Sequence, residues 1–395
     1  MKITHVECHI LVVKDLTVEA NSSAQDDIVV IVHTDEGISG VGEADTNPWC
    51  VQALIKSPGT HNLARGLEEM IVGCDPLEVE ALWDKMYTGS FMSGRRGAGI
   101  CAIGALDMAL WDIRGKALGV PCWKLLGGAC KECVIPYASL LPTGETVESQ
   151  KRSLVAKVRD AKRLGFRAAK LEVVIMGPYA HNNVRGTNQD LVETVAECRD
   201  AVGSEMVLMV DVCYSWNGAR EALRVINALV PYNPYFVETP IHLDDLDGYA
   251  YLHEHSPIPI SAGELQNGRF EFAELMDKGN VDVAQPDVGR VGGLTEAKRV
   301  CDMARDRGKL IVPHCWKTAI GIWASVHLGA TAPHCPYIEF LPPSLSESAL
   351  RRELVLNEPA LEDGGIPLPS TPGLGVELNP AALERYKADA ALRVG

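Results

Sequence analysis

Alternation of polar and apolar residues dominates the first 45 residues and indicates a strand meander. The N-terminus, MKITHVECHILVV, alternates in this way, as a half-buried strand does. The segments IVVIVHT (28–34) and ISGVGE (38–43) flank the turn Asp35-Glu36-Gly37, which predicts a hairpin after the first strand. We therefore expect a small antiparallel sheet at the start of the chain.

Two helices are predicted next. PLEVEALWDKMY (76–87) begins with Pro76, a residue that suits the first turn of a helix. In GAGICAIGALDMALWDIRGKALG (97–119) apolar residues recur at steps of three and four, which is typical of an amphipathic helix, and Gly119 is a stop signal. Together with the meander, these helices predict an α+β domain over residues 1–130.

The pattern changes near residue 131, where short β-rich runs begin to alternate with helical stretches. The predicted strands are 135–140, 168–174, 207–213, 235–238, 258–263, 281–285, 309–313 and 336–340. Eight strands separated by helices imply parallel βαβ units that can close into a barrel. We predict an α/β fold, a modified TIM barrel of the (β/α)7β type over residues 131–340, beneath the N-terminal capping domain. The proline-rich tail, 341–395, is expected to pack back on that domain and complete it.

Composition narrows the classes of function. The chain has 395 residues, and 37 basic against 52 acidic side chains give a formal charge of −15. A surface this acidic argues against nucleic acid as a partner. No apolar run approaches the roughly 20 residues that span a bilayer, and the N-terminus lacks a signal-peptide layout. Twelve scattered cysteines suit reduced thiols, so we expect a cytoplasmic protein that does not bind membranes.

Charged side chains stand at the ends of most predicted barrel strands, where barrel enzymes gather their chemistry. They are Lys170, Glu172, Asp211, Glu238, Glu264, Asp287, His314 and Glu339. From Asp211 onward the separations are 27, 26, 23, 27 and 25 residues. Each separation is close to one βα unit, so these side chains can ring one mouth.

Three successive strand ends, Asp211, Glu238 and Glu264, predict a metal site. Three converging carboxylates repel one another unless a cation lies between them. An all-oxygen set suits a hard divalent ion, and Mg²⁺ is the ion that we expect. The alternative is that these are ordinary polar strand ends that face solvent.

Ordered motifs along nearly the whole chain resemble the enolase superfamily, specifically its mandelate racemase and muconate lactonizing branch. AIGALDMALWDIRGKALGVPCWKLLGG (102–128) resembles the linker between capping domain and barrel in that branch. VDVCYSW, FVETP and SAGE resemble its three metal-ligand strands. QPDVGRVGGLTEA, followed by VPHCW, resembles the stretch that bears its Asp–His dyad.

The resemblance implies a reaction that begins with abstraction of the proton α to a substrate carboxylate, with one Mg²⁺ per subunit stabilising the enediolate. By position, the implied metal ligands are Asp211, Glu238 and Glu264. His314 would be the base, and Asp287 would orient its imidazole. Lys170 and Glu339 would meet the substrate carboxylate, Glu339 as a hydrogen-bond donor if anionic neighbours raise its pKa. The implied partners are a small-molecule carboxylate and further copies of the chain.

The second barrel strand departs from the branch. Racemases and many dehydratases of the branch carry Lys-x-Lys there, the second lysine being a base opposite the histidine, whereas this chain has Lys170-Leu171-Glu172. Inversion of the α-carbon needs one base on each face of the substrate, and the second lysine base is absent here. A reaction that uses His314 as its single base therefore fits this chain better. In that chemistry His314 takes the α-proton and then protonates the departing β-hydroxyl, which is a syn dehydration to a 2-keto-3-deoxy acid.

We therefore predict a dehydratase of an acid sugar, an aldonate or an aldarate. The alternatives are a racemase or epimerase with Glu172 as its second base, and a catalytically silent metal-binding homologue. Glu172 itself has three possible roles: a salt bridge to Lys170, which we favour, a contact to a substrate hydroxyl, or a weak second base. Cys213 stands where the branch usually has asparagine, which leaves the polar contact at that position open.

Substrate identity is expected to lie in three polar, partly aromatic loops, 19–27, 47–61 and 177–186. Loops of this composition suit a hydroxylated ligand such as a sugar acid. The residues predicted to contact it are Tyr179, His181, Arg185 and Trp316.

Overall fold

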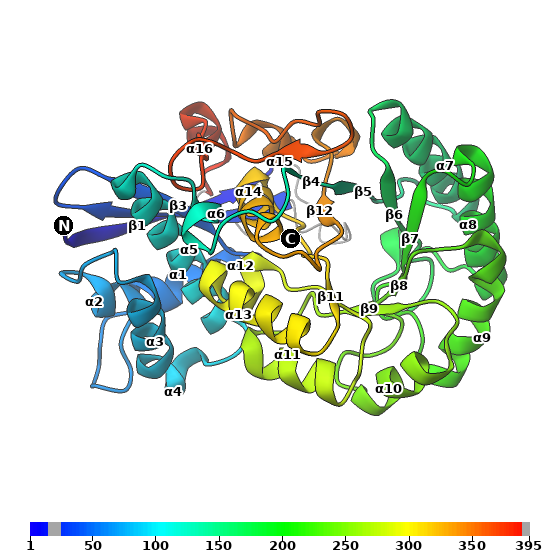
Figure 1. Cartoon of the computed structure of the whole chain (residues 1–395), viewed down its shortest axis with the longest axis horizontal. Coiled ribbons are helices and arrows are strands. Elements are labelled where there is room, and N and C mark those ends of the chain that lie inside the picture. The colour runs from blue at the N-terminus through cyan, green and yellow to red at the C-terminus, as the bar shows by residue number, and fades with distance from the viewer. Residues whose placement is uncertain (15–24, 389–395) are drawn as a thin grey trace.

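The computed structural model describes residues 1–14 and 25–388. Residues 19–24 of the predicted specificity loop 19–27 lie outside this description. Figure 1 shows a capping domain on the left and a barrel on the right, with the long helix α5 between them. Within the described residues, no helix is both long enough and apolar enough to cross a membrane.

The capping domain contains the predicted antiparallel sheet. Its strands are β1 (Ile3–Val12), β2 (Asp26–Thr34) and β3 (Ser39–Glu43), paired in that order. The helices that follow are α1 (Pro48–Lys56), α2 (Leu67–Ile71), α3 (Val79–Gly89) and α4 (Phe91–Gly94). Two predictions were wrong here. Helix α3 begins after Pro76 rather than with it, and segment 47–61 is largely helix α1, because Asn47 caps its amino end.

Helix α5 (Ala98–Leu118) occupies the predicted range but is not amphipathic. It is buried on nearly every side, because β3 covers one face and the barrel helices α12 (Val288–Val291) and α13 (Gly293–Asp306) cover another. The sheet comes unusually close: a Cβ on Gly40 or Gly42 would lie 2.0 Å from a carbonyl oxygen of α5. Only glycine allows this approach, which joins the cap tightly to the helix that leads into the barrel.

Eight parallel strands form the barrel sheet, in the order β11-β10-β9-β8-β7-β6-β5-β12. They are β5 (Pro136–Leu140), β6 (Ala168–Glu172), β7 (Val207–Asp211), β8 (Val237–Glu238), β9 (Ile260–Ala262), β10 (Val283–Ala284), β11 (Leu310–Ile311) and β12 (Ile338–Phe340). Besides α12 and α13, the crossover helices are α7 (Val147–Arg163), α8 (Asn188–Val202), α9 (Ala219–Leu229), α10 (Leu246–His255), α11 (Gly268–Asp277) and α14 (Ala319–Ala330).

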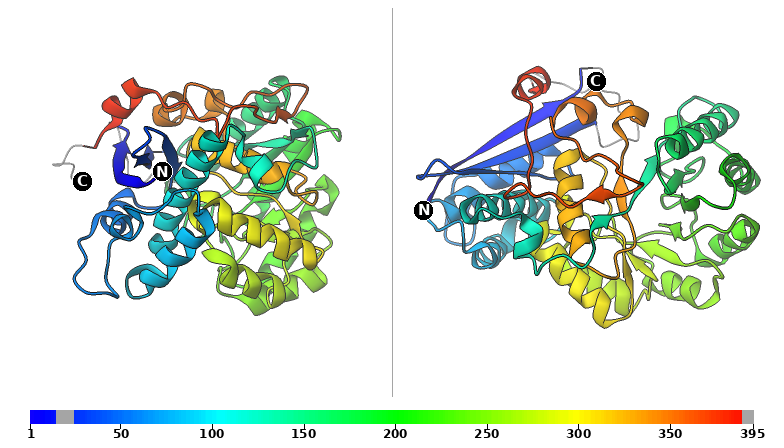
Figure 2. Two further views of the ribbon diagram at one scale, coloured as in Figure 1. Left: turned by 60° about the vertical axis from the view of Figure 1, so that its left-hand side comes forward. Right: turned by 45° about the horizontal axis from the view of Figure 1, so that its top comes forward.

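The sheet curls until its two end strands meet. The Ile311 N–H donates to the His334 carbonyl and the Glu339 N–H donates to the Pro313 carbonyl, both at 3.1 Å. Eight strands joined by seven helical crossovers confirm the predicted (β/α)7β architecture. Figure 2 shows these crossover helices around the outside of the sheet.

The C-terminal segment returns to the cap, as predicted. Short β13 (Ile366–Pro367) pairs with β4 (Cys133–Val134). Helices α15 (Ala349–Glu353) and α16 (Pro380–Tyr386) bury apolar side chains against β1 and β2, and Figure 2 shows α16, in red, beside β1. The tail therefore covers the outer face of the capping sheet, while the domain limits at residues 130 and 340 stay predictions.

Buried acids of the cap fix its position on the barrel. The Asp112 carboxylate on α5 accepts hydrogen bonds from the Val41 N–H at 3.0 Å and the Leu374 N–H at 2.9 Å. Glu43, at the end of β3, accepts from the Gly321 N–H at 2.6 Å and from the Thr318 hydroxyl at the start of α14. Asp112 thus joins α5 to β3 and to the C-terminal segment, and Glu43 joins the cap to the start of barrel helix α14.

A buried histidine makes a similar connection at the base of the cap. His327 on α14 accepts a hydrogen bond from the Trp123 N–H and donates one to the Leu374 carbonyl, both at 3.1 Å. Its side chain is fully buried, and this burial lowers its pKa from about 6.5 to about 4. The neutral imidazole is therefore the form that the folded chain accommodates.

We expect the free energy of unfolding to fall as the pH is lowered from about 6.5 to about 4. Between these values the unfolded chain binds a proton at His327 that the folded chain does not, which destabilises the fold by up to roughly 3 kcal/mol. Urea titrations of the wild type and His327→Gln across this range measure the effect. The variant should show a shallower pH dependence, and the exposed-site control His255→Gln should behave as the wild type. Equal slopes in all three proteins would contradict the assignment.

Candidate active site

Strand register places three of the predicted acids at one depth in the barrel mouth. Glu172 on β6 pairs in register with Asp211 on β7, which pairs in register with Glu238 on β8. Glu264 follows β9 by two residues, and all four side chains are at most 8% exposed. Because parallel strands end at the same rim, these carboxylates lie together at the carboxyl end of the barrel.

Lys170 lies at the centre of these carboxylates. Its Nζ is 2.7 Å from Glu238 Oε1, 2.9 Å from Glu339 Oε1 and 3.4 Å from Asp211 Oδ2. Burial disfavours the ammonium, but the Glu238 and Glu339 carboxylates outweigh it and raise the pKa of Lys170 well above its usual range. The side chain therefore stays charged and lowers the repulsion among its neighbours.

Glu339 is an acceptor, which corrects the prediction that it donates a hydrogen bond. Its Oε1 accepts from the Ser139 hydroxyl at 2.6 Å, and its Oε2 accepts from the Cys315 N–H at 2.9 Å. Burial acts to raise its pKa, but Lys170 and His314 lower the pKa of Glu339 to about 2. A carboxylate surrounded by donors keeps its charge, so Glu339 balances the cations near it.

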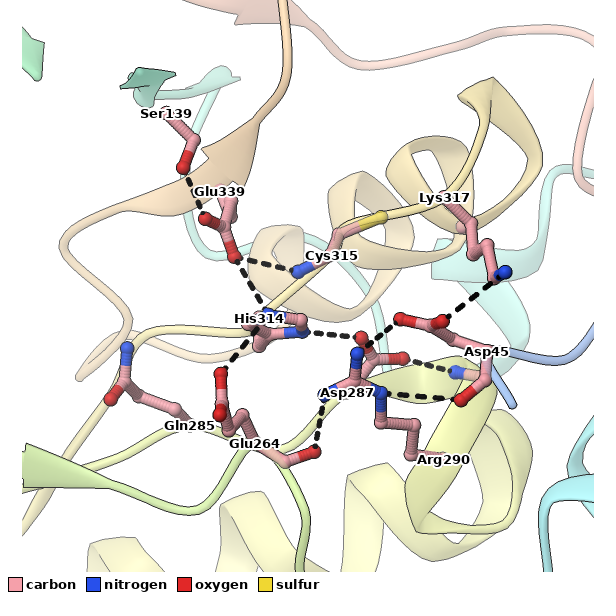
Figure 3. A network of polar contacts seen from close by, with 12 residues as sticks. Asp45, Ser139, Glu264, Gln285, Asp287, Arg290, His314, Cys315, Lys317 and Glu339 are labelled. Atoms are coloured by element: carbon pink, nitrogen blue, oxygen red, sulfur yellow. Dashed lines mark hydrogen bonds and ion pairs between the residues drawn. The ribbon is translucent and has the colours of Figure 1, made fainter. Parts of the chain in front are cut away.

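The predicted Asp–His dyad is present in the structure. His314 Nδ1 lies 2.6 Å from Asp287 Oδ2, while its Nε2 faces Glu264 at 3.3 Å and Glu339 at 3.7 Å (Figure 3). Burial opposes protonation, but Glu339 and the hydrogen bond to Asp287 raise the pKa of His314 to about 9. One nitrogen is thus held by the aspartate and the other points into the mouth, as a proton-transferring histidine requires.

The capping domain supports this dyad through residues that no sequence motif singled out for the site. Asp45 Oδ2 lies 2.6 Å from Arg290 Nη2, and Arg290 also donates to the Glu264 carbonyl at 3.2 Å. Lys317 Nζ lies 3.6 Å from the second oxygen of Asp45. Asp287 caps α12 through the Gly289 N–H at 2.7 Å. Figure 3 shows this network joining the cap, β9, β10 and β11.

Left-handed backbone follows β7 and β8. Cys213, Tyr214 and Thr239 have φ values of 42°, 60° and 45°, a conformation that costs roughly 1–3 kcal/mol in non-glycine residues. The turns orient donors toward the acids: the Thr239 hydroxyl donates to Asp211 at 3.1 Å and the Tyr214 hydroxyl to Glu264 at 2.9 Å. Burial and the nearby Asp211 raise the pKa of the Cys213 thiol well above its usual range.

Donor type and charge fit a divalent cation at the mouth. Four buried carboxylates, those of Asp211, Glu238, Glu264 and Glu339, share one ammonium and one imidazole. Burial and the neighbouring acids raise the pKa of Glu238 well above its usual range, although Lys170 acts against them. Such a set is stabilised by a further positive charge, and its hard oxygen atoms suit Mg²⁺.

The predicted ligands do not, however, converge as they stand. Among the described residues, two groups place three possible ligand atoms within 4.8 Å of one another, and neither is the predicted trio. Glu264 instead faces His314 and Tyr214, and Glu238 faces Lys170.

Neither of the two compact groups is suited to a metal ion. In the first, Asp45, Asp287 and His314, both acids already have partners, because Arg290 and Lys317 pair with Asp45 and His314 pairs with Asp287. The second consists of His5, Glu7 and His33 on the open face of the capping sheet. Its two imidazoles stack 4.3 Å apart, and both present Nε2 to Glu7 Oε1, at 3.7 Å and 3.3 Å, so this partly exposed carboxylate already pairs with them.

Glu172 pairs with His181 and not with Lys170, which corrects the favoured prediction. His181 Nε2 lies 3.1 Å from Glu172 Oε1, and both side chains are buried. Burial raises the pKa of Glu172, while His181 acts to lower it. Lys170 and Glu172 share a face of β6, but the lysine reaches across the barrel to Glu238 and Glu339. The loop after β6 supplies the partner instead.

A cavity of about 730 Å³ adjoins the mouth at the ends of β5, β11 and β12. His181 and Trp316 line it, together with Leu141 and Leu341. The other two predicted substrate contacts, Tyr179 and Arg185, are not among its described lining residues. Tyr179 is half-exposed and packs edge-on against Tyr214 at 5.8 Å, and Arg185 donates to the adjacent Val184 carbonyl.

The sequence matches two family descriptions. Residues 8–127 match the mandelate racemase/muconate lactonizing enzyme N-terminal domain, and residues 153–382 match the enolase C-terminal domain-like family. A D-galactarolactone cycloisomerase from Agrobacterium fabrum is 31% identical, covering 98% of this chain and 99% of that protein. A D-galactonate dehydratase from Xanthomonas campestris is 32% identical, covering 90% of this chain and 89% of that protein.

Solved structures agree with these matches. The 3,6-anhydro-D-galactonate cycloisomerase from Zobellia galactanivorans superposes with a TM-score of 0.86 at 32% identity, covering 98% of this chain and all of that one. A racemase from Streptomyces coelicolor with bound magnesium has a TM-score of 0.82 at 26% identity, covering 98% of this chain and all of that one.

Mg²⁺ should raise the thermal unfolding temperature of chelator-treated protein, because it relieves repulsion among the mouth carboxylates. At 100 times its dissociation constant a bound ion adds about 2.7 kcal/mol of stability. Differential scanning fluorimetry with and without Mg²⁺ measures the shift. Asp211→Asn should remove most of it, whereas the exposed-site control Asp244→Asn should keep it. An Mg²⁺ response that survives Asp211→Asn would contradict the ligand assignment.

Proposed function

Because the chain belongs to the mandelate racemase/muconate lactonizing enzyme family of the enolase superfamily, we propose that it is a Mg²⁺-dependent dehydratase of an acid sugar, an aldonate or an aldarate. The observation that carries the proposal is the His314–Asp287 dyad, 2.6 Å apart and facing the mouth carboxylates. The relatives named D-galactonate dehydratase support the same reaction class.

His314 is the residue that removes the proton α to the substrate carboxylate. The neutral imidazole is the form that acts as the base. Its Nδ1 is engaged by Asp287, so Nε2 is the nitrogen that takes the proton. Asp287 then stabilises the imidazolium and keeps the ring in one orientation. When bound by Asp211, Glu238 and Glu264, Mg²⁺ would stabilise the negative charge that develops on the substrate carboxylate.

Lys170 supports the same step by its positive charge. Its ammonium lies between Glu238 and Glu339, so it lowers the cost of adding an anionic substrate to an acidic pocket. Loss of the β-hydroxyl from the deprotonated substrate gives an enol, which tautomerises to a 2-keto-3-deoxy acid. The cap covers the mouth through Asp45 and Glu43, which limits the access of water to this intermediate.

A lactone cycloisomerase is the second candidate, favoured by the relative of that name that matches 98% of the chain. Both reactions begin with loss of the proton α to a carboxyl group. They differ in whether the oxygen that leaves the β-carbon is a hydroxyl or part of a ring. The same dyad serves either reaction, so the substrate decides between them.

We expect one or two acids from a panel of hexonates, pentonates, aldarates and their lactones to give a 2-keto acid with Mg²⁺. Semicarbazone formation measures the product of dehydration, and NMR identifies ring-opened or cyclised isomers. His314→Asn should lower the rate by about 10²- to 10⁴-fold, because the variant keeps a polar side chain but lacks a base.

A chelator should abolish the same activity, and restored Mg²⁺ should return it. A silent panel that shows no α-proton exchange in D₂O would contradict the proposal and favour a silent metal-binding homologue. Exchange or inversion at the α-carbon with no elimination would favour an epimerase.

A further inference from the structure

The Glu172–His181 pair has no part in the reaction as described so far. Glu172 ends β6 at the depth of Asp211, and His181 belongs to a short 3-10 helix in the loop after that strand. The pair is 3.1 Å apart, and its members are 8% and 4% exposed. It is therefore a second histidine–carboxylate pair at the same end of the barrel as the His314–Asp287 dyad.

The two pairs lie on different sides of the mouth. His314 follows β11 and Glu172 ends β6. Because the sheet closes between β12 and β11, the strands β12 and β5 lie between these two positions. The predicted metal ligands occupy β7, β8 and β9, on the other arc of the ring. A substrate held by its carboxylate at that arc therefore has one histidine pair on each flank.

Access to a ligand distinguishes His181 from a histidine that only packs. It lines the cavity of about 730 Å³ beside the mouth, as does Trp316, two residues beyond His314. Leu141 and Leu341, which follow β5 and β12, line the same cavity. The cavity has room for a six-carbon acid beside the carboxylate site.

The imidazole of His181 is not what holds its loop in place. The His181 N–H donates to the Val174 carbonyl at 3.0 Å, and Gln150 donates to the His181 carbonyl at 3.2 Å. The Gly186 N–H donates to the Ile175 carbonyl at 2.7 Å at the far end of the loop. Backbone contacts therefore hold this loop, and the His181 side chain pairs with Glu172.

We infer that His181, held by Glu172, is a second catalytic residue that protonates the departing β-hydroxyl of the substrate. The inference rests on the proposed dehydration. His314 takes the α-proton, the β-carbon–oxygen bond breaks, and the leaving oxygen takes a proton from the His181 imidazolium and departs as water. Glu172 stabilises that imidazolium before transfer, and solvent reprotonates the imidazole after it.

This assignment changes the stereochemistry expected from sequence. A single histidine that removes and returns the proton acts on one face and gives syn elimination. Two histidines on separate flanks allow the proton and the hydroxyl to leave from opposite faces. The substrate is then an acid sugar whose α-hydrogen and β-hydroxyl are anti when its carboxylate is bound.

The test compares a good substrate with its analogue that carries fluorine in place of the β-hydroxyl, because fluoride leaves without a proton. For His181→Asn we expect dehydration of the natural acid to fall by about 10²- to 10³-fold. Fluoride release, followed with an ion-selective electrode, should stay within a few-fold of the wild type. Glu172→Gln should show the same split in weaker form. The matched control is His253→Asn, from a histidine–aspartate pair (2.8 Å to Asp282) at the opposite end of the barrel.

Each outcome has one meaning. Equal losses on both substrates in His181→Asn would overturn the assignment, because a folded enzyme with an intact base would still release fluoride. Unchanged dehydration in His181→Asn would overturn it as well. Failure of the dehydratase proposal itself is distinguishable, because the wild type would then produce neither keto acid nor fluoride from any acid. Solvent exchange of the α-proton should persist in His181→Asn and be lost in His314→Asn.

Discussion

The contact of Lys170 with Glu238 and Glu339 is the interaction on which the rest of the site depends. Parallel strands deliver several carboxylates to one rim, and the barrel buries them there. Without a cation among them their mutual repulsion would oppose folding. One ammonium offsets only part of that charge, and the remaining carboxylate oxygens suit a divalent ion. The same electrostatic balance therefore bears on the stability of the fold and on the Mg²⁺ binding that we propose.

The capping domain takes a direct part in this arrangement. Asp45, which follows β3, reaches Arg290 beside the His314–Asp287 dyad, and Arg290 in turn donates to the Glu264 carbonyl. The cap therefore contributes a side chain to the polar network around the dyad. Gly42 lets β3 lie against α5, so Asp45 is presented by a sheet that packs on the helix leading into the barrel.

Much of the fold and the outline of the site could be predicted, because both depend on local periodicity. The spacing of one acid per βα unit predicted that Asp211 and Glu238 lie on neighbouring strands. The strand register then places them side by side at one depth. Pairings across the fold could not be predicted in this way. Glu339 accepts a hydrogen bond from Ser139, 200 residues earlier, and Lys170 and His314 keep it charged. The partner of Glu172 lies in a loop whose path no sequence pattern specifies. Arg290 stood within the motif QPDVGRVGG, but its role required Asp45 from another domain.

The strand carboxylates and the two histidines differ in how firmly the fold holds them, and we propose that they differ in function accordingly. Carboxylates on β7 and β8 are fixed by the sheet, and in the reaction that we propose they serve stabilisation of charge next to the substrate carboxylate. In the same proposal the proton carriers lie on the flanks, His314 after β11 and His181 in a loop. A change in that loop would alter the leaving-group side of the site without disturbing the carboxylates on the strands. Relatives named dehydratase and cycloisomerase have similar identity to this chain, and a site divided in this way would allow both reactions.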